Sequence, residues 1–227
     1  MRNIIVVGAG GFGRDIFEYV SDVGKTSPDI KAKGLLDDDP KVQLLQDRYP
    51  NVPILGDTRT YQIEQGDEFL ISVGDPVGRK TLAERLADRG ARFYTLVHPT
   101  AYVSPSARIG AGCIVGPFAC VGSYSKLEKN ILLCVYAVVG HDCGVGSHST
   151  FSPFSVATGG SSIGSEVFFG SHAVVTPLKR VGSGSKVAAG AVVYHDIPEE
   201  CLVTGNPATF RRQVLVSKRR SGGESAK

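Results

Sequence analysis

An apolar residue returns at every sixth position of this chain for almost one hundred residues, without a change of phase. The positions are Val97, Val103, Ile109, Val115, Val121, Leu127, Leu133, Val139, Val145, Phe151, Ala157, Ile163, Phe169, Val175, Val181, Val187 and Val193. A period of six fits neither the 3.6-residue repeat of an α-helix nor the two-residue repeat of a strand. Hexapeptide repeats are instead a signature of the parallel β-helix, in which each repeat forms one side of a triangular coil.

This repeat predicts the architecture of the second part of the chain. Three hexapeptides make one coil of about eighteen residues, and successive coils stack at a spacing of ~4.8 Å. The apolar anchors point inward, a small side chain four residues later lies near the corner, and the abundant glycines allow tight corners. A solenoid needs covered ends. We expect the preceding residues to cap one end and the segment after Pro198 to cap the other.

The first part of the chain follows a different pattern. Residues 4–8, 31–39, 54–57 and 68–75 have the composition of short strands, and residues 11–24 and 76–90 that of amphipathic helices. In the first helix Ile16, Phe17, Val20 and Val23 share one face. Strands alternating with helices predict a small parallel sheet. We therefore expect a Rossmann-like α/β domain at 1–96, a β-helix at 97–204, and a C-terminal segment at 205–227 with a flexible basic tail.

Composition limits the cellular context and the partners. The net charge of +3 owes much to the final KRRSGGESAK, so the chain does not have the charge of a nucleic-acid-binding protein. Five cysteines without a CxxC pair favour a reducing compartment over a disulfide framework or a zinc site. We find no signal peptide and no apolar run of the ~18 residues that a membrane span requires. These features predict a cytoplasmic protein.

One histidine–aspartate pair stands within the repeats. The eighteen-residue coil places His141 between Ser123 and Gly159 in the neighbouring coils. His141 follows its anchor by two positions and should therefore project outward, with Asp142 able to fix its tautomer. A glycine at position 159 leaves its backbone N–H accessible, so a base and a hydrogen-bond donor would lie side by side, as acyl transfer requires. A surface histidine without a function is the alternative.

The segment GAGGFG at residues 8–13 follows a strand and opens a helix. Such a loop binds phosphate through backbone N–H groups. About 90 residues precede the solenoid, too few for the two halves of a dinucleotide-binding fold, so we expect Gly10, Gly11, Phe12 and Gly13 to bind the diphosphate of a nucleotide sugar. Asp37 and Asp38, at the end of the second strand, either bind the ribose or base or form a solvated turn.

Several short motifs together resemble a known family. They are GAGGFGRD, LLDDD, SVGD, HPTA, GHDCGVG and GNPA, and they extend over residues 3 to 212. The chain resembles the left-handed β-helix sugar acyltransferases, and more narrowly the bacterial nucleotide-sugar N-acetyltransferases and sialic acid O-acetyltransferases. The resemblance adds Gly74, in SVGD, to the expected substrate-binding residues. Phe12 and Thr150 stand where some relatives have histidine.

The resemblance also implies roles for individual residues. It implies a homotrimer that binds acetyl-CoA between coils of neighbouring subunits, with His141 as general base and Asp142 orienting it. Gly159 would lie near the acetyl carbonyl. Further coenzyme A contacts would come from the backbone along the pantetheine arm and from basic residues near the phosphates, namely Ala188, Ala189, Gly190, Arg211 and Arg212.

The expected function is acetyl transfer from acetyl-CoA to an amino group, the 4-amino group, of a nucleotide-linked deoxysugar. The alternatives are O-acetylation of a sugar hydroxyl such as that of a sialic acid, a zinc hydratase on the same solenoid, a nicotinamide-dependent oxidoreductase and a non-catalytic trimeric scaffold. We expect no metal, because His141, His148 and His172 fall on three different sides of the triangle. His98 should lie at the domain junction, and His148, His172 and His195 on the surface.

Overall fold

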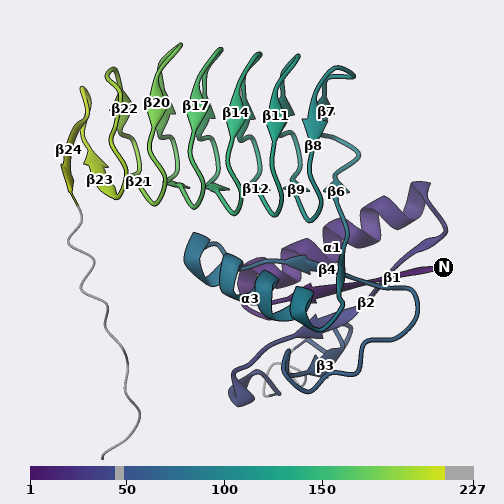
Figure 1. Cartoon of the computed structure of the whole chain (residues 1–227). Helices are drawn as coiled ribbons and strands as arrows, with labels where there is room; N and C mark the ends of the chain where they lie inside the picture. The colour runs from purple at the N-terminus through teal and green to yellow at the C-terminus, as the bar shows by residue number, and fades with distance from the viewer. Residues whose placement is uncertain (44–48, 213–227) are drawn as a thin grey trace, which may run out of the picture.

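The structure is a computed structural model that describes residues 1–43 and 49–212. The basic tail expected at the C-terminus falls in residues 213–227, outside the described residues. Figure 1 shows a small α/β unit and a long solenoid lying alongside it. This arrangement confirms the predicted fold class, and the exact division of the chain at residues 96 and 204 stays a prediction. No helix within the described ranges is both long enough and apolar enough to cross a membrane.

The α/β unit is built on one parallel sheet, which we call sheet A. Its strands lie in the order β3-β2-β1-β4-β5, with bounds β1 Arg2–Val7, β2 Ile30–Leu36, β3 Ile54–Gly56, β4 Asp67–Ile71 and β5 Arg92–Phe93. The helices are α1 Gly11–Thr26 and α3 Pro76–Asp88, with a short 3₁₀ helix at Pro40–Gln43. Strands β1 to β4 and the two α-helices agree with the ranges predicted from the sequence, whereas β5 and the 3₁₀ helix were not predicted.

Local chemistry explains both helices. In α1 the side chains of Ile16, Val20 and Val23 are buried against the sheet, as the 3.6-residue spacing predicts. Helix α3 begins where Asp75 accepts a hydrogen bond from the Gly78 N–H at 2.9 Å, with a proline in the first turn. A carboxylate cap and an early proline both favour a helix start at this point.

The solenoid consists of three sheets, parallel except for the last strand β24, which form the three faces of a triangular prism. Sheet B contains β6 Leu96–Val97, β9 Ile114–Val115, β12 Leu132–Leu133, β15 Thr150–Phe151, β18 Phe168–Phe169, β21 Lys186–Val187, β23 Cys201–Thr204 and β24 Thr209–Arg212. Sheet C contains β7 Tyr102–Val103, β10 Cys120–Val121, β13 Val138–Val139, β16 Val156–Ala157, β19 Val174–Val175 and β22 Val192–Val193. Sheet D contains β8 Arg108–Ile109, β11 Lys126–Leu127, β14 Gly144–Val145, β17 Ser162–Ile163 and β20 Arg180–Val181.

The coils stack with the register that the sequence predicts. Val139 pairs with Val121 in the coil before it and with Ala157 in the coil after it, so paired residues are eighteen positions apart. The anchors from Val115 onward are buried in one continuous core. Within this core the rings of Phe151 and Phe169 stack with their centroids 4.3 Å apart. Val103 and Ile109 in the first coil are partly buried and pack against the same core, so the inward direction of the anchors is confirmed from Val103 onward.

The glycines that follow the anchors have a different role from the one expected. The left-handed backbone positions of the corners are mostly occupied by other residues, for example Tyr136 and Asp142. Gly122 and Gly146 instead lie against the next coil, where an added Cβ would come within 2.6 Å and 2.4 Å of backbone atoms. These glycines are needed for close packing between coils, and not for their conformational freedom.

The α/β unit does not cap the solenoid, which corrects the expectation. It packs along sheet B, where Leu96, Ile114 and Leu132 join α1 in one apolar cluster. His98 lies in this junction as predicted, where its ring approaches Asp22 on α1 at 3.3 Å. The first coil is consequently open at its outer end, and the first anchor, Val97, is 37% exposed. A face-on contact buries more apolar surface of the sheet than an end-on contact would.

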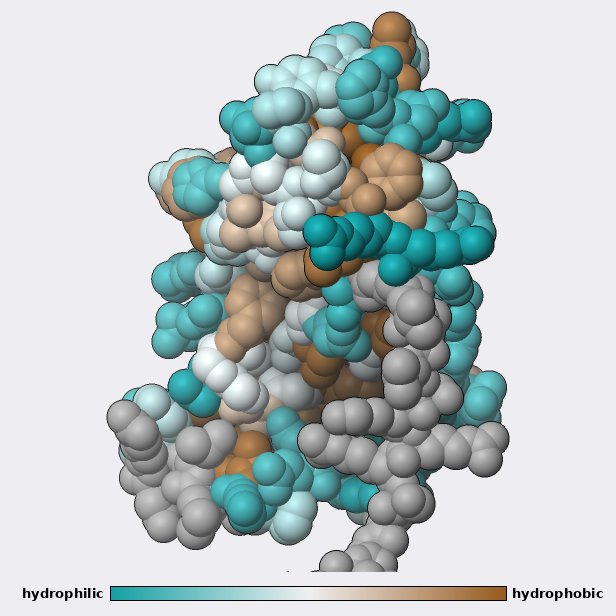
Figure 2. Space-filling view, turned by 90° about the vertical axis from the view of Figure 1, so that its left-hand side faces the viewer, coloured by the Kyte–Doolittle hydropathy of each residue, from teal (hydrophilic) through white to brown (hydrophobic). Residues whose placement is uncertain are grey.

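The segment after Pro198 covers the other end of the solenoid, as predicted. Strand β23 continues sheet B as a further parallel strand, and β24 turns back to pair with it antiparallel. Cys201 and Val203 are buried under this end. Figure 2 looks onto this end of the molecule and shows a mixture of hydrophilic and hydrophobic residues in place of one continuous apolar surface.

Arg79 joins the two units from inside the protein. Its side chain on α3 is fully buried, and its guanidinium donates four hydrogen bonds to three main-chain carbonyl oxygens. The acceptors are the carbonyl oxygens of Ile71 and Val73, at the end of β4, and of Asn130, in the solenoid. Burial lowers the pKa of Arg79 to about 10, which keeps it charged at neutral pH. No carboxylate pairs with it among the described residues.

His148 was expected on the surface, and this expectation is wrong. The side chain is only 4% exposed, because α3 covers the solenoid edge on which it lies. It lines a cavity of about 250 Å³ together with Ala83, Glu84 and Lys129. Burial, followed by the nearby charges of Arg79 and Lys129, lowers the pKa of His148. The helix itself was predicted at residues 76–90, but its position over this edge of the solenoid was not.

The buried His148 predicts a loss of stability in acid. A histidine whose pKa is lower in the folded state contributes stability above its unfolded pKa of about 6.5, and this contribution is lost as the pH falls. We expect the urea concentration at the unfolding midpoint to decrease as the pH falls below about 6.5, and to decrease less in His148→Gln. The exposed His195 provides the control variant, which should behave as wild type. Equal pH profiles for wild type and His148→Gln would contradict this prediction.

Candidate functional site

The carboxyl ends of β1 and β4 form the first part of the site. The strand order of sheet A reverses between these two neighbours, and open α/β sheets bind ligands at that point. Gly10 follows β1 and Gly74 follows β4, so the fold brings two sequence-predicted residues to the same edge of the sheet. Ser72 holds the two loops together, because its hydroxyl donates to the carbonyls of Val7 and Gly8 at 2.8 Å and 2.9 Å.

The glycine loop is suited to binding an anion. Gly10 caps α1 without a side-chain hydrogen bond, and the first turn carries no acid. The first N–H groups of the helix are therefore available to a ligand. Phe12, another predicted contact, is half-buried and packs against the apolar junction cluster. Gly13 is buried, and an added Cβ would lie 1.8 Å from the Gly8 carbonyl oxygen, so packing requires a glycine here, and its contact with substrate stays a prediction.

Sequence reasoning overlooked Arg14 in this loop. Its guanidinium donates to the Ala9 carbonyl at 3.3 Å and lies 4.2 Å from the ring centroid of Tyr49. A Cβ added at Gly11 would be 3.8 Å from the same guanidinium. A positive charge therefore stands beside the open N–H groups of α1. The available signal was an arginine directly after the glycine motif.

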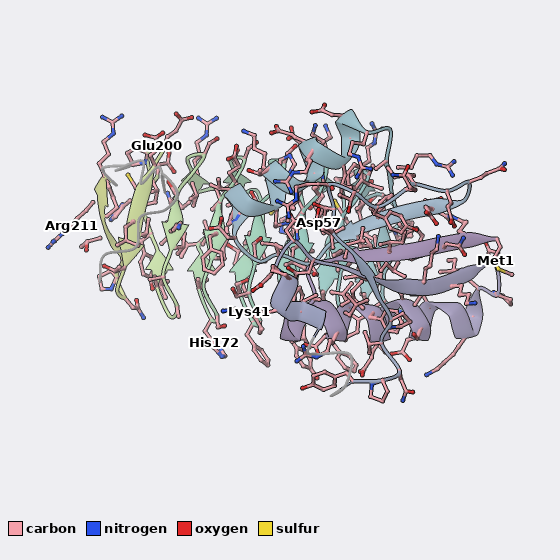
Figure 3. The ribbon with its side chains drawn as sticks, turned by 90° about the horizontal axis from the view of Figure 1, so that it is seen from below. Met1, Lys41, Asp57, His172, Glu200 and Arg211 are labelled. Atoms are coloured by element: carbon pink, nitrogen blue, oxygen red, sulfur yellow. The ribbon has the colours of Figure 1, made fainter. Side chains whose placement is uncertain are left out.

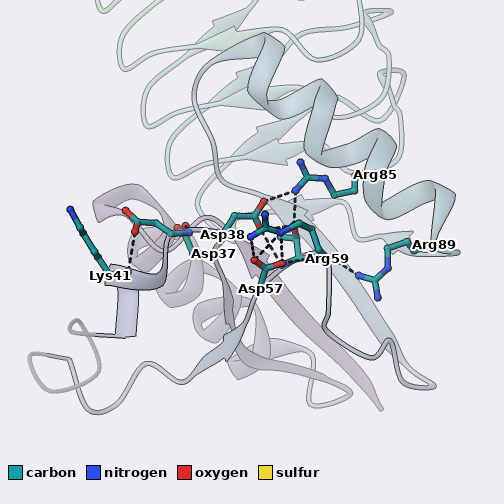
Figure 4. A network of polar contacts seen from close by, with 9 residues as sticks. Asp37, Asp38, Lys41, Asp57, Arg59, Arg85 and Arg89 are labelled. Carbon is teal, nitrogen blue, oxygen red and sulfur yellow. Dashed lines mark hydrogen bonds and ion pairs between the residues drawn. The ribbon is translucent and has the colours of Figure 1, made fainter. Parts of the chain in front are cut away.

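Asp37 and Asp38 are engaged within the protein, as Figure 4 shows. Asp37 accepts a hydrogen bond from the Ala9 N–H at 2.7 Å and thereby ties the end of β2 to the glycine loop. Asp38 pairs with Arg85 and accepts from both the N–H and the hydroxyl of Thr58. Burial raises the pKa of Asp38, but the hydrogen bonds from Thr58 and Arg85 outweigh it and leave the pKa lowered.

These acids border a cavity of about 350 Å³ outside the ends of β2 and β3. The lining also includes Asp57 and Arg59, which form an ion pair with each other. Asp38 is thus held by partners inside the domain, and its lone pairs are largely used. Asp37 lies between this cavity, which it lines, and the glycine loop, to which it is hydrogen-bonded.

The second part of the site is the pair His141 and Asp142. They lie in the turn between β13 and β14, at the edge where sheets C and D meet. The imidazole is 71% exposed and the carboxylate 61% exposed, so the predicted outward direction is confirmed. The Nδ1 atom of His141 is 2.8 Å from the Asp142 carboxylate. This contact fixes the proton on Nδ1 and leaves Nε2 with a free lone pair.

Gly159 lies directly against this imidazole. An added Cβ would stand 2.4 Å from the Nε2 atom of His141 and 2.5 Å from its Cε1. Only glycine therefore leaves the ring in place. Within the described residues the N–H of Gly159 donates to no protein acceptor. A basic nitrogen and a free donor consequently stand side by side, as predicted from the eighteen-residue stacking.

The two parts of the site face away from each other within one chain. The α/β unit covers sheet B, and His141 lies at the edge between sheets C and D, on the opposite side of the prism. The loops that carry Gly10 and Gly74 therefore lie across the prism from His141 of the same chain.

The remaining predicted residues lie in other places. Ala188, Ala189 and Gly190 form a turn at the edge between sheets B and C. Arg211 and Arg212 are exposed on β24, and Figure 3 shows Arg211 at the far end of the solenoid. Thr150 is buried on sheet B, whereas His141 belongs to another edge. One chain alone therefore does not gather these residues around His141.

Three histidines of the solenoid stay apart, as the hexapeptide count predicts. His141, His148 and His172 lie in the turns after β13, β14 and β18, each at a different edge of the prism. His172 is exposed as predicted, and its ring stacks on Phe154 with centroids 4.9 Å apart. The exposed position of His195 is also as predicted.

Comparison with known families and proteins adds to this geometry. Residues 3–86 match the model of the PglD N-terminal domain. UDP-N-acetylbacillosamine N-acetyltransferase of Bacillus subtilis (strain 168) is 36% identical over 115 residues, which are 51% of this chain and 51% of that protein. The matched region of the chain spans about half the length of the curated relatives.

Solved structures match over a greater length. PerB from Caulobacter crescentus, in complex with CoA and GDP-perosamine, is 30% identical with a TM-score of 0.82, covering 93% of this chain and 98% of that one. The acetyltransferase domain of PglB from Neisseria gonorrhoeae, in complex with acetyl coenzyme A, is 31% identical with a TM-score of 0.79. That alignment covers 92% of this chain and 98% of the domain.

Proposed function

Because the chain belongs to the family of hexapeptide-repeat sugar N-acetyltransferases, we propose that it acetylates an amino group, the 4-amino group, of a nucleotide-linked deoxysugar with acetyl-CoA. The observation that carries this proposal is the contact of the His141 imidazole with the backbone of Gly159. It supplies a base and a donor next to each other, as acyl transfer needs. Five cysteines that are all free thiols fit a cytoplasmic setting.

In this proposal Nε2 of His141 removes a proton from the sugar amine as the amine nitrogen attacks the thioester carbonyl. The negative oxygen that forms accepts a hydrogen bond from the Gly159 N–H. The C–S bond then breaks, and the coenzyme A thiolate takes up the proton held by His141. Asp142 keeps the ring in the required tautomer and stabilises its charged form.

We further propose that the working unit is a homotrimer with its sites between subunits. The support is the separation of the two parts of the site, because the loops that carry Gly10 and Gly74 lie across the prism from His141. A neighbouring copy would bring its α/β unit to the free edge of sheets C and D. The same arrangement would let Ala188, Ala189, Gly190 and the arginines of β24 serve coenzyme A bound at an edge of another subunit.

An acetylation assay tests the activity. We expect release of coenzyme A thiol when acetyl-CoA is combined with a UDP-, GDP- or dTDP-linked 4-amino sugar, and no release with the corresponding 4-hydroxy sugars. A dependence on a hydroxyl acceptor in place of the amine would assign the chain to O-acetylation. If the folded protein acetylates none of these acceptors, the proposal is wrong.

Subunit mixing tests the shared site. His141→Ala and a glycine-loop variant, Gly11→Glu, should each be inactive, since one lacks the base and the other blocks the anion site with a carboxylate. If every site combines two subunits, reassembling a 1:1 mixture should restore about one quarter of wild-type activity. A site formed within one subunit would give no recovery.

A further inference from the structure

A groove on sheet D has no role in the site described so far. Its volume is about 790 Å³, and its lining runs from Pro105 and Ser106 in the first coil to Asp142 and Gly144 in the third. Asp142 is the partner of His141, so the groove ends at the catalytic pair. Sheet D is also a face that the chain's own α/β unit leaves free, since that unit packs on sheet B.

Two cations lie side by side in this groove. Arg108 and Lys126 are paired on the adjacent strands β8 and β11 and point outward from the same face. Both are exposed, and within the described residues neither side chain forms an ion pair or hydrogen bond. Like charges facing each other on neighbouring strands destabilise a sheet. An anion bound between them would turn this repulsion into attraction.

The rest of the groove leaves room for such an anion and for a ring. Gly144 is next in the column of Arg108 and Lys126, and a Cβ added there would meet nothing within 4 Å. Tyr124 lies at the rim of the groove and is 70% exposed. Two positive charges near a bare stretch of backbone and an exposed aromatic ring suit a diphosphate that carries a flat ring system.

Distance along the solenoid decides between the two diphosphates of the proposed reaction. Lys126 and Arg108 lie one and two coils before Gly144, or about 5 Å and 10 Å along the axis. In a nucleotide sugar the diphosphate is bonded directly to the sugar ring that carries the amine. In coenzyme A the whole pantetheine arm separates the diphosphate from the thioester. A diphosphate this close to His141 therefore belongs to the nucleotide sugar.

We propose that Arg108 and Lys126 bind the diphosphate of the nucleotide sugar whose amine His141 deprotonates, and that Tyr124 packs on its sugar or base. This inference rests on the proposed function. It names two substrate-binding residues on the solenoid, which complement the glycine loop of a neighbouring copy. A nucleotide sugar would thus be held from both sides, by α1 of one subunit and by sheet D of the next.

The test is calorimetric titration of the full-length protein with UDP, GDP, dTDP and coenzyme A. The variant is Arg108→Gln/Lys126→Gln. The control is Arg180→Gln, which removes a cation from the same column of sheet D but outside the groove. We expect the double variant to raise the Kd of the bound nucleoside diphosphate about 10-fold or more, because charge-assisted hydrogen bonds are lost. The Kd of coenzyme A should change less than about 2-fold, and the control should match wild type.

Three outcomes would overturn the inference. The first is an unchanged Kd for the nucleoside diphosphate in the double variant, and the second is an equal loss in Arg180→Gln. The third is a loss of coenzyme A affinity in place of nucleotide affinity, which would assign the groove to the other substrate. If wild-type protein binds none of the four ligands, the proposed function itself fails, and this inference fails with it.

Discussion

Replacing His141 with alanine or asparagine is expected to lower the turnover number for acetyl transfer by ~10²-fold or more, as for loss of a positioned general base. Neither alanine nor asparagine has a basic nitrogen in place of Nε2 to accept the amine proton. The fold should persist, because the imidazole is 71% exposed and contributes little packing. The measurement is the steady-state rate of thiol release, with circular dichroism to verify folding. His195→Ala, at another exposed histidine, is the matched control.

A second variant separates the position of the base from its presence. Gly159→Ala keeps His141 but places a methyl group 2.4 Å from the present position of Nε2, so the ring must move. The backbone of Gly159 is not left-handed, and alanine fits it without strain. We expect at least a ~10-fold lower turnover, since small misplacements of reacting groups are costly. Turnover within a few-fold of wild type in all these variants would show that His141 is not the base.

Replacing Arg79 with methionine is expected to cost about 3 kcal/mol in free energy of unfolding. The change removes hydrogen bonds to the carbonyls of Ile71, Val73 and Asn130, all at a buried site. Carbonyls left without donors keep their desolvation penalty, while the lost cost of burying a charge offsets part of it. The free energy of unfolding of Arg79→Lys should lie between those of wild type and Arg79→Met, because one ammonium group cannot reach both β4 and the solenoid turn.

Urea denaturation measures this effect, and the chain offers a close control. Lys80 is the next residue on α3 and also bridges to the solenoid, through an ion pair with Glu166 at 2.8 Å. That pair is partly exposed, so Lys80→Met should cost only about 0–1 kcal/mol. Equal midpoints for the Arg79 and Lys80 variants would show that the buried guanidinium does not stabilise the junction.

The architecture of the solenoid could be read from the sequence because its contacts are periodic. Val139 pairs with residues eighteen positions away on either side, and every coil repeats this relation. One rule therefore placed Gly159 beside His141, although no local pattern connects them. The helices of the α/β unit were predictable for a similar reason, since spacing along the chain decides which residues share a face.

Contacts that follow no period were not predictable. The packing of the α/β unit on sheet B buries His148 and leaves Val97 exposed, and the hexapeptide period predicts neither result. Asp38 meets Arg85 forty-seven positions later, and Arg79 meets the Asn130 carbonyl fifty-one positions later. Only the tertiary structure shows that these polar groups already have ion-pair or hydrogen-bond partners within the chain.

By itself the sequence determined the stack of coils, the outward direction of His141 and its neighbour Gly159, because a six-residue period allows one inward residue per side. The tertiary structure decided which face of the prism the α/β unit covers, and so which edge stays free for a second subunit. That choice depends on the apolar residues beside the anchors on sheet B, such as Ile114 and Leu132, and on the helix that meets them. Leu96, Ile114 and Leu132 recur at intervals of eighteen positions, but helix α1 belongs to no repeat, so no spacing in the chain identifies the contact between them.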